Sequence, residues 1–281
     1  MIIRTLVENT SISEDFACEH GLSLYVETKT AKLLFDVGAS DLFRRNAKKL
    51  DVDIADVDAL VISHGHFDHG GGLATFLKKN QKAKVYLHPL AFGKYYARRP
   101  NDRLDYIGLD TELGDHERIV HTSDRFPIGE KTYVFSNVVQ REALPKSNGG
   151  LYVEDQGLKV ADTFAHEQNL VVEEDGRFLL ITGCAHNGIL NILWHFQSLE
   201  GRMPDFVIGG FHLSSRSGGQ ENPEEIDRIA CALIGTGAKF FTCHCTGLDV
   251  YKRMKSRMGA QIEYLSAGSE VTLKGIYSKD P

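Results

Sequence analysis

Short apolar runs separated by turn residues mark the first third of the chain, which is the pattern of β-strands. Between two of these runs Leu42, Phe43, Ala47 and Leu50 recur at helical spacing and predict a helix. The elements expected up to residue 88 are strands at 2–7, 22–27, 32–36, 59–63 and 84–87, with helices at 42–50 and 73–79.

The remaining chain changes from strand patterns to an alternation of helix and strand patterns. Asp175-Gly176 predicts a hairpin turn, Pro223 stands at a helix start and Gly201 at a helix end. The expected strands are 119–121, 132–135, 151–153, 170–172, 178–181, 205–208, 239–243 and 262–265, and the expected helices are 188–199, 223–235 and 248–258.

The order of these elements predicts an α/β fold. A β-rich stretch followed by helices alternating with strands, repeated roughly twice, indicates two sheets packed together with helices outside. We find no fixed-period repeat, low-complexity segment or linker, so we expect one domain over residues 1–281. Residues 89–117 differ, because they are aromatic and basic without clear periodicity. They predict a lid or insertion, or else a solvated excursion that packs over the core.

Composition and charge narrow the class of partner. The 281 residues carry a net charge of −6 and contain no run of five like charges, so nucleic acid is not expected, although an anionic substrate could meet a locally positive pocket. No apolar stretch approaches the roughly 20 residues that span a bilayer. The five scattered cysteines and the lack of a signal segment predict a cytoplasmic protein with reduced thiols. We expect a small-molecule substrate. The sequence does not predict the oligomeric state.

A dense group of metal-binding side chains follows the expected strand 59–63. In an extended chain His64 and His66 point the same way and can hold one metal ion, while Asp68 and His69, after the chain turns, can face a second ion. Imidazole and carboxylate groups suit Zn²⁺, Mn²⁺ and iron. A glycine-rich turn without a function would seldom collect these side chains, so we predict a metal site.

Later segments offer further ligands. His186 follows Cys184 by two residues, so either side chain or both could bind a metal; alternatively, Cys184 is a small buried residue. If neither bridges two ions, the second ion would be weakly held, and a one-metal site is the alternative. His244 follows the strand 239–243 and is expected to point into the site. Cys243 and Cys245 are expected to point away from the site, because successive strand side chains alternate.

The segment 64–69 resembles the His-x-His-x-Asp-His motif of the metallo-β-lactamase superfamily. Residues 33–38, 178–183 and 239–244 resemble further strands of that family, in the expected order. Short blocks such as Gly-Cys-Ala-His at 183–186 and Gly-Gly-Phe-His-Leu at 209–213 resemble a narrower branch, that of 7,8-dihydropterin-6-methyl-4-(β-ribofuranosyl)aminobenzene-5′-phosphate synthase-like proteins. The resemblance implies an αββα four-layer sandwich.

The resemblance also implies roles for individual residues. Asp36 would orient the histidine loop, and Cys184 stands where many members carry an Asp that bridges two metals. His166 lies where other branches have a metal-binding His, but we expect it to be a surface or supporting residue. His212 resembles an accessory histidine over the substrate phosphate, which could stabilise negative charge or donate a proton. The implied metal ligands are His64, His66, Asp68, His69, His186, His244 and Cys184, around two Zn²⁺ ions, with Mn²⁺ or iron as alternatives.

These residues predict a metal-dependent hydrolase that acts on an ester, lactone or phosphoester, with Asp68 orienting the attacking water and His212 assisting. The narrower branch implies an alternative, a transferase that joins a pterin diphosphate to a ribofuranosyl-aminobenzene phosphate. The aromatic and basic residues 95–106 would suit a phosphorylated aromatic substrate. An iron-dependent redox protein is disfavoured because no flavodoxin-like or rubredoxin-like segment is recognisable. A catalytically inactive metal sensor is disfavoured because nearly all ligands are present.

Overall fold

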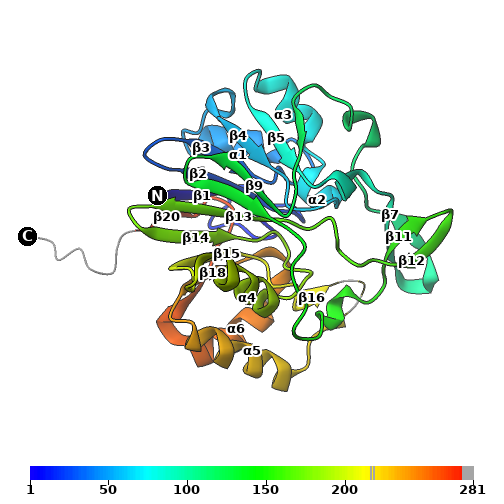
Figure 1. The fold of residues 1–281 in the computed structure, drawn as a ribbon, viewed down its shortest axis with the longest axis vertical. Helices are drawn as coiled ribbons and strands as arrows, with labels where there is room; N and C mark the ends of the chain where they lie inside the picture. The colour runs from blue at the N-terminus through cyan, green and yellow to red at the C-terminus, as the bar shows by residue number, and fades with distance from the viewer. Residues whose placement is uncertain (216, 218, 274–281) are drawn as a thin grey trace, which may run out of the picture.

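The computed structural model describes residues 1–215, 217 and 219–273, and its core is two seven-stranded sheets packed face to face. Helices cover the outer face of each sheet, at the top and bottom of Figure 1. The expected αββα four-layer sandwich is therefore confirmed.

The first sheet positions the histidine segment. Strands β3, β4, β5 and β8 are parallel, so their carboxyl ends meet at one edge, and the loops after β3 and β4 carry Asp36 and residues 63–70. Helices α1 (Leu42–Lys49) and α3 (Leu73–Lys79) pack on its outer face. The strand order is β20 (Glu270–Thr272), β1 (Ile2–Val7), β2 (Ser23–Glu27), β3 (Lys32–Phe35), β4 (Ala59–Val61), β5 (Lys84–Leu87) and β8 (Ile119–His121).

The second sheet repeats this arrangement with the later ligands. Its parallel strands β14, β15, β18 and β19 also end at a common edge. Helices α4 (Ile189–Glu200), α5 (Pro223–Gly235) and α6 (Leu248–Met258) cover its outer face. The strand order is β19 (Ile262–Tyr264), β18 (Lys239–Thr242), β15 (Phe206–Gly209), β14 (Arg177–Ile181), β13 (Asn169–Glu174), β10 (Thr132–Phe135) and β9 (Arg125–Gly129).

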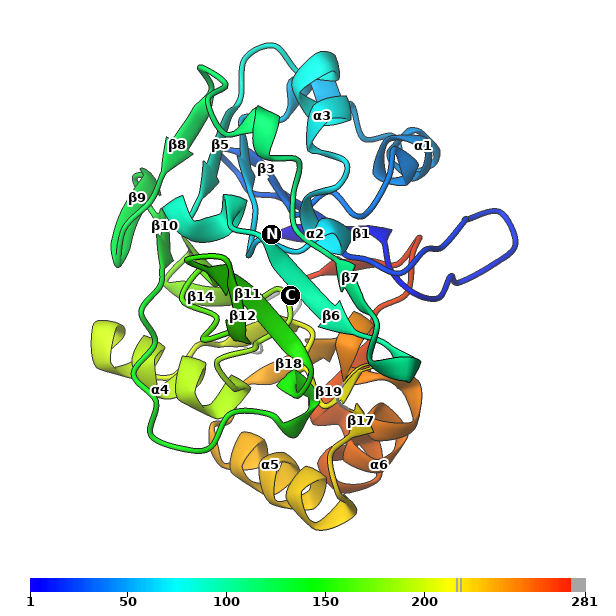
Figure 2. The same ribbon diagram turned by 90° about the vertical axis from the view of Figure 1, so that its right-hand side faces the viewer.

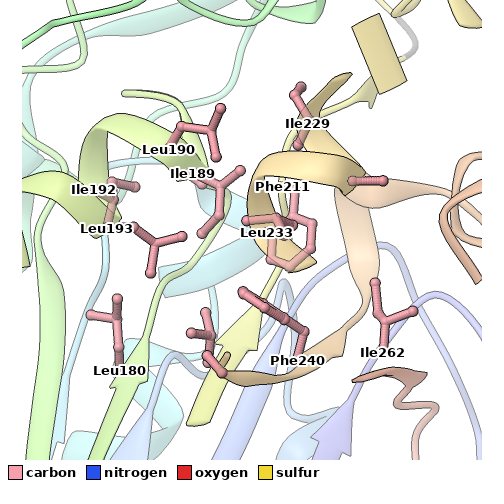
Figure 3. Close-up of a cluster of buried hydrophobic side chains, with 14 of the residues drawn as sticks. Leu180, Ile189, Leu190, Ile192, Leu193, Phe211, Ile229, Leu233, Phe240 and Ile262 are labelled. Carbon is pink, nitrogen blue, oxygen red and sulfur yellow. The ribbon is translucent and has the colours of Figure 1, made fainter. Parts of the chain in front are cut away.

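Strands buried on both faces explain the nearly continuous apolar runs of the sequence. In β3, Leu33 and Phe35 point into the core between the sheets, whereas Leu34 points toward α1 and α3. In β18, Phe241 faces the central core and Phe240 packs under α5 and α6 (Figure 3). Each strand therefore belongs to two cores, and this rigidity fixes the strand ends from which the ligand loops emerge.

A polar side chain ties the two sheets together at the ligand end. Gln168, which is fully buried before β13, donates from Nε2 to the carbonyl oxygens of Ile62 (2.8 Å) and Tyr86 (3.1 Å), and its Oε1 accepts from Thr122 Oγ1 at 2.6 Å. All three partners lie at the ends of strands of the first sheet. The amide thus satisfies carbonyl groups that would otherwise be buried without a hydrogen bond.

Residues 89–117 contain two strands that sequence periodicity did not predict. Strands β6 (Tyr95–Arg98) and β7 (Leu104–Tyr106) join β11 (Leu151–Asp155) and β12 (Leu158–Ala161) in a four-stranded sheet at the side of the sandwich (Figures 1 and 2). Tyr95 and Ala97 face inward with Leu151 and Phe164. The outward-facing residues of these strands interrupt the pattern of apolar positions in the sequence, so the strands were not recognised. Whether this small sheet acts as a lid stays a prediction.

The expected elements agree closely with the structure, with ends displaced by one or two residues. The expected strand 239–243 ends one residue early, at Thr242, and that difference matters at the site. Apart from short 3₁₀ turns, the remaining elements are α2 (Phe67–Gly70), β16 (Ser214–Ser215) and β17 (Gly219–Gln220). No helix of the described residues is long and apolar enough to cross a membrane.

We predict that Phe240→Ala lowers the free energy of unfolding by about 3–5 kcal/mol, because it removes a fully buried ring and leaves a cavity under α5 and α6. Leu158→Ala is the control, since that side chain is 69% exposed, and should change stability by no more than about 0.5 kcal/mol. Urea denaturation of metal-free protein measures both. Equal losses in the two variants would contradict the layered core.

Candidate metal centre

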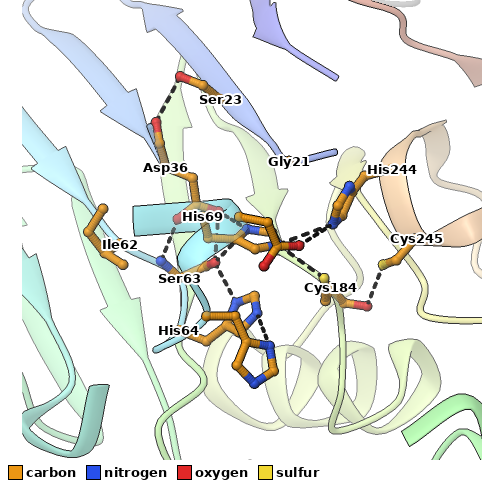
Figure 4. A network of polar contacts seen from close by, with 12 residues as sticks. Gly21, Ser23, Asp36, Ile62, Ser63, His64, His69, Cys184, His244 and Cys245 are labelled. Carbon is orange, nitrogen blue, oxygen red and sulfur yellow. Dashed lines mark hydrogen bonds and ion pairs between the residues drawn. The ribbon is translucent and has the colours of Figure 1, made fainter. Parts of the chain in front are cut away.

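Loops from both sheets bring all seven predicted ligands to one end of the sandwich, and Figure 4 shows His64, His69, Cys184 and His244 among them. The first sheet supplies His64 and His66 after β4, and Asp68 and His69 on the short helix α2. The second sheet supplies Cys184 and His186 after β14, and His244 after β18. All seven residues are buried.

Three histidines form a first group. The Nε2 atom of His64 lies 3.1 Å from Nδ1 of His66, and the ligand nitrogens of these residues and His186 all lie within 4.8 Å of one another. His186 Nε2 is buried and has no hydrogen-bond partner. Buried polar atoms without partners are costly, so this nitrogen fits a site completed by a cation.

A second group surrounds His69. Its Nε2 atom lies 3.2 Å from both His244 Nε2 and Cys184 Sγ, and Asp68 Oδ2 lies 3.3 Å from His244 Nε2. Four ligands around a tetrahedral zinc ion, with bond lengths near 2.0–2.1 Å to nitrogen, stand about 3.3 Å apart. The spacing of these side chains therefore fits a divalent metal ion.

Cys184 lies between the two groups. Its sulfur atom is within 4.8 Å of ligand atoms of His64 and His69, and also of His186 and His212. The thiol is buried, and burial raises its pKa well above the usual range. A neighbouring cation acts in the opposite direction and favours the thiolate. The position thus suits a ligand shared by two ions.

Asp36 orients two of the histidines, as the family resemblance implies (Figure 4). Its Oδ2 atom accepts from His69 Nδ1 at 2.6 Å and from Ser63 Oγ at 2.7 Å, and the Ser63 backbone N–H donates to Oδ1 at 2.7 Å. Because the Ser63 hydroxyl proton goes to Asp36, the hydroxyl oxygen accepts from His64 Nδ1 at 2.8 Å. The Nδ1 atoms of both rings are therefore held by protein acceptors, and the Nε2 atoms face the site.

Two asparagines orient the histidines of the second sheet in the same way. Asn148 Oδ1 accepts from His186 Nδ1 at 2.8 Å, and Asn9 Oδ1 accepts from His244 Nδ1 at 2.9 Å. The amide oxygen fixes the tautomer in each case and leaves Nε2 for the site. Sequence reasoning missed both asparagines, since neither lies in a ligand segment.

The electrostatics match neutral imidazole ligands in the first group. Burial, helped by the neighbouring ring of His166, lowers the pKa of His66 to about 3, and burial holds the pKa of His64 and His186 well below the usual range. His69 differs: burial alone would lower its pKa, but the carboxylates of Asp36 and Asp68 raise it to about 9.

His166 is buried, which excludes the surface alternative, and it supports the histidine loop, as the other alternative expected. Its Nδ1 accepts from the Gly65 backbone N–H at 2.9 Å, and its Nε2 lies 3.1 Å from Asp162 Oδ2. Asp162, which sequence reasoning missed, also lies 4.0 Å from His66 Nε2. Both nitrogens of His166 thus face protein partners and turn away from a metal.

Both cysteines beside His244 were expected to point away from the site. That expectation is wrong for Cys245. Strand β18 ends at Thr242, and residues 244–246 form a 3₁₀ turn in which His244 has φ +50°. Strand alternation therefore does not apply. The Cys245 sulfur lies within 4.8 Å of ligand atoms of Cys184 and His244, whereas Cys243 packs into the core between the sheets.

Several ligand loops contain a left-handed residue other than glycine. Asp36, Ala185, His212 and His244 have φ between +44° and +60°. This conformation costs about 1–2 kcal/mol for each such residue. Four residues in this conformation at the strand ends show that surrounding contacts hold the loops in place.

Two buried glutamates supply such contacts. Glu167 accepts from the backbone N–H groups of His186 (2.6 Å) and Asn187 (2.9 Å). Glu8 accepts from the His244 N–H at 2.7 Å and from Tyr264 Oη at 2.7 Å. Sequence reasoning missed both, because a glutamate at a strand end carries no signal of burial.

A pocket of about 310 Å³ opens over the ligands. His212 lines it, and both of its ring nitrogens are buried without hydrogen-bond partners. His20 also lines it, with Nε2 3.3 Å from Asp68 Oδ2. Ile107 and Leu151 of the small-sheet region contribute apolar surface on another wall. The pocket is large enough for a small molecule.

Comparisons with known proteins agree with this geometry. The family model of the metallo-β-lactamase superfamily matches residues 17–218. An uncharacterized protein of Methanocaldococcus jannaschii is 29% identical over 255 residues, which cover 90% of this chain and 93% of that protein. The 7,8-dihydropterin-6-methyl-4-(β-D-ribofuranosyl)-aminobenzene-5′-phosphate synthase of the same organism is 27% identical over 282 residues, covering 95% and 94%.

A solved structure is similar over its whole length. The crystal structure of Tm1679, named a metal-dependent hydrolase of the β-lactamase superfamily, superposes with a TM-score of 0.82 and 31% sequence identity. The superposition covers 98% of this chain and 100% of that chain.

We predict that Asp36→Asn weakens metal binding by about 10–100-fold, because the amide is uncharged and has one acceptor oxygen, so it cannot accept from His69 Nδ1, Ser63 Oγ and the Ser63 backbone N–H together. Competition with a chromophoric zinc chelator measures the affinity. Asp175→Asn makes the same chemical change at an exposed turn carboxylate and should leave the affinity unchanged. An unaltered affinity in Asp36→Asn would show that His69 does not depend on this carboxylate.

Proposed function

The chain belongs to the metallo-β-lactamase superfamily, and from this premise we propose that it is a hydrolase with two divalent metal ions that cleaves an ester, lactone or phosphoester. The observation that carries the proposal is the position of Cys184 between two groups of ligand atoms. One group alone would be compatible with a structural or single-metal site. Two adjoining groups beneath a pocket are the arrangement that hydrolysis of such substrates uses.

The donor set indicates which residues would hold each ion. His64, His66 and His186 would hold one ion, and Asp68, His69 and His244 the other, with the Cys184 thiolate between them. Nitrogen and sulfur donors together favour Zn²⁺. Bound at this place, the ions would polarise the substrate and lower the pKa of a water molecule.

The chain's own residues would orient the reacting groups. Asp68, between His20 and His244, keeps a pKa well below its usual range even though burial opposes this, because His69, His244 and His20 surround it. It would therefore be an acceptor that orients water. His212 lines the pocket with free ring nitrogens, so it could donate a proton to the leaving group or stabilise developing negative charge.

A transferase that joins a pterin diphosphate to a ribofuranosyl-aminobenzene phosphate is the second candidate. Its support is the similarity, at 27% identity over nearly the whole chain, to a protein named as that synthase. The same pocket and ligands would serve it. The two functions differ in whether water or a second substrate accepts the transferred group, so experiments must separate them.

We predict that protein purified without added metal carries about two zinc ions per chain, measured by plasma mass spectrometry. Cys184→Ser should release one of them far more readily to a chelator, because a hydroxyl is a poor substitute for a thiolate between two ions. Cys231→Ser, which alters an exposed thiol on α5, is the control. Two tightly held ions in Cys184→Ser would refute the shared-ligand assignment, and one iron per chain would favour the redox alternative.

We predict that the zinc- or manganese-loaded protein hydrolyses at least one substrate in a panel of model phosphodiesters, lactones, thioesters and β-lactams. His212→Ala should lower kcat by about 100-fold or more, with metal content measured in parallel. His195→Ala is the matched control, because that ring stacks on Phe135 away from the ligands. No hydrolysis of any substrate, together with tight binding of a pterin phosphate, would contradict the hydrolase and favour the transferase.

A further inference from the structure

One strongly basic side chain lines the pocket over the ligands. Among the described residues around this pocket Arg99 is the single lysine or arginine. It follows β6 directly, where the small sheet approaches the β16–β17 hairpin (Figure 2). Its side chain is 27% exposed, so the guanidinium is accessible from the pocket and yet partly shielded from solvent.

The guanidinium is held in place without being neutralised. Arg99 Nε lies 3.1 Å from Asp105 Oδ2, and Nη1 lies 3.5 Å from Ser217 Oγ. Asp105 also pairs with Arg103, whose Nε lies 2.8 Å from Oδ1. One carboxylate therefore serves two guanidinium groups, and a positive charge remains at the pocket wall.

The other acidic groups of the pocket do not compete for Arg99. Glu19 accepts from the backbone N–H groups of Ala39 and Ser40, both at 3.1 Å, and from Ser40 Oγ at 2.7 Å. Asp68 faces His20 and His244. The hydroxyl-bearing Ser214 and Ser217 also line the pocket and could add hydrogen bonds.

We propose that Arg99 binds an oxyanion of the substrate, a phosphate or carboxylate group that is separate from the bond being cleaved. The planar guanidinium matches such groups with two parallel hydrogen bonds. This inference rests on the proposed function, because it names the substrate class of the same pocket. It makes Arg99 a specificity-determining residue that contacts a remote end of the substrate.

Arg98 provides a matched control. It is the last residue of β6, directly before Arg99, but its guanidinium lies over the ring of Tyr152, 5.1 Å from the centroid, and its Nε is 3.8 Å from Asp102 Oδ1. It is not among the described residues that line the pocket. Arg98→Gln therefore removes the same charge from the same sheet without touching the proposed anion site.

The test measures binding of three small acids to the zinc-loaded full chain by calorimetry. Glutarate and 4-phosphonobutyrate carry a second anionic group, whereas valerate has a methyl group in its place. Wild-type protein should bind one of the dianions at least about tenfold more tightly than valerate. Arg99→Gln should bring that ratio to near one, Arg99→Lys should retain part of it, and Arg98→Gln should keep it.

Equal ratios in wild type and Arg99→Gln would overturn the anion site. The 4-nitrophenyl esters of the same acids extend the test to turnover, where the preference should appear mainly in KM. If neither these esters nor any substrate of the earlier panel is hydrolysed and the binding ratio still depends on Arg99, the hydrolase proposal fails while the anion site stands. The stronger of the two dianions identifies the preferred oxyanion.

Discussion

The carboxylate of Asp36 is the contact on which the ligand loops depend. It is fully buried directly after β3, and it receives hydrogen bonds from Ser63 in the loop after β4 and from His69 on α2. A buried carboxylate is tolerable only when it is well paired. The groups that satisfy it are therefore the groups that aim two imidazoles, so the stability of this corner and the orientation of its ligands share one cause.

Buried carboxylates also hold the ligand loops of the second sheet. Glu167 and Glu8 are buried. Glu167 accepts a hydrogen bond from the backbone N–H group of His186, and Glu8 accepts one from that of His244. These loops carry left-handed residues that ordinary strand ends avoid. These buried carboxylates thus hold the loops by hydrogen bonds. The strands that carry the loops are buried on both faces and rigid, so the loops cannot relax.

The sequence was sufficient for the fold and for the candidate ligands that lie in compact segments, which the structure brings together. His64, His66, Asp68 and His69 could be found because metal chemistry is concentrated within six residues, and the apolar runs located nearly all core strands. Cys245 was assigned to the wrong side because one residue's difference in the end of β18 replaced strand alternation by a 3₁₀ turn. Asp162 and Asn148 reach the site through long-range folding, which no local pattern records.

The division of the ligands between the two sheets has a consequence for the order of folding. Residues 64–69 come from the first sheet, while Cys184, His186 and His244 come from the second, more than a hundred residues later. Neither half of the sandwich can complete either ligand group alone. The long loops would therefore have to close and the two apolar faces would have to dock before either candidate ligand group is complete. A cation held by a complete group would stabilise the docked sandwich against any unfolding that breaks that group, whether the sheets separate or one of them unravels.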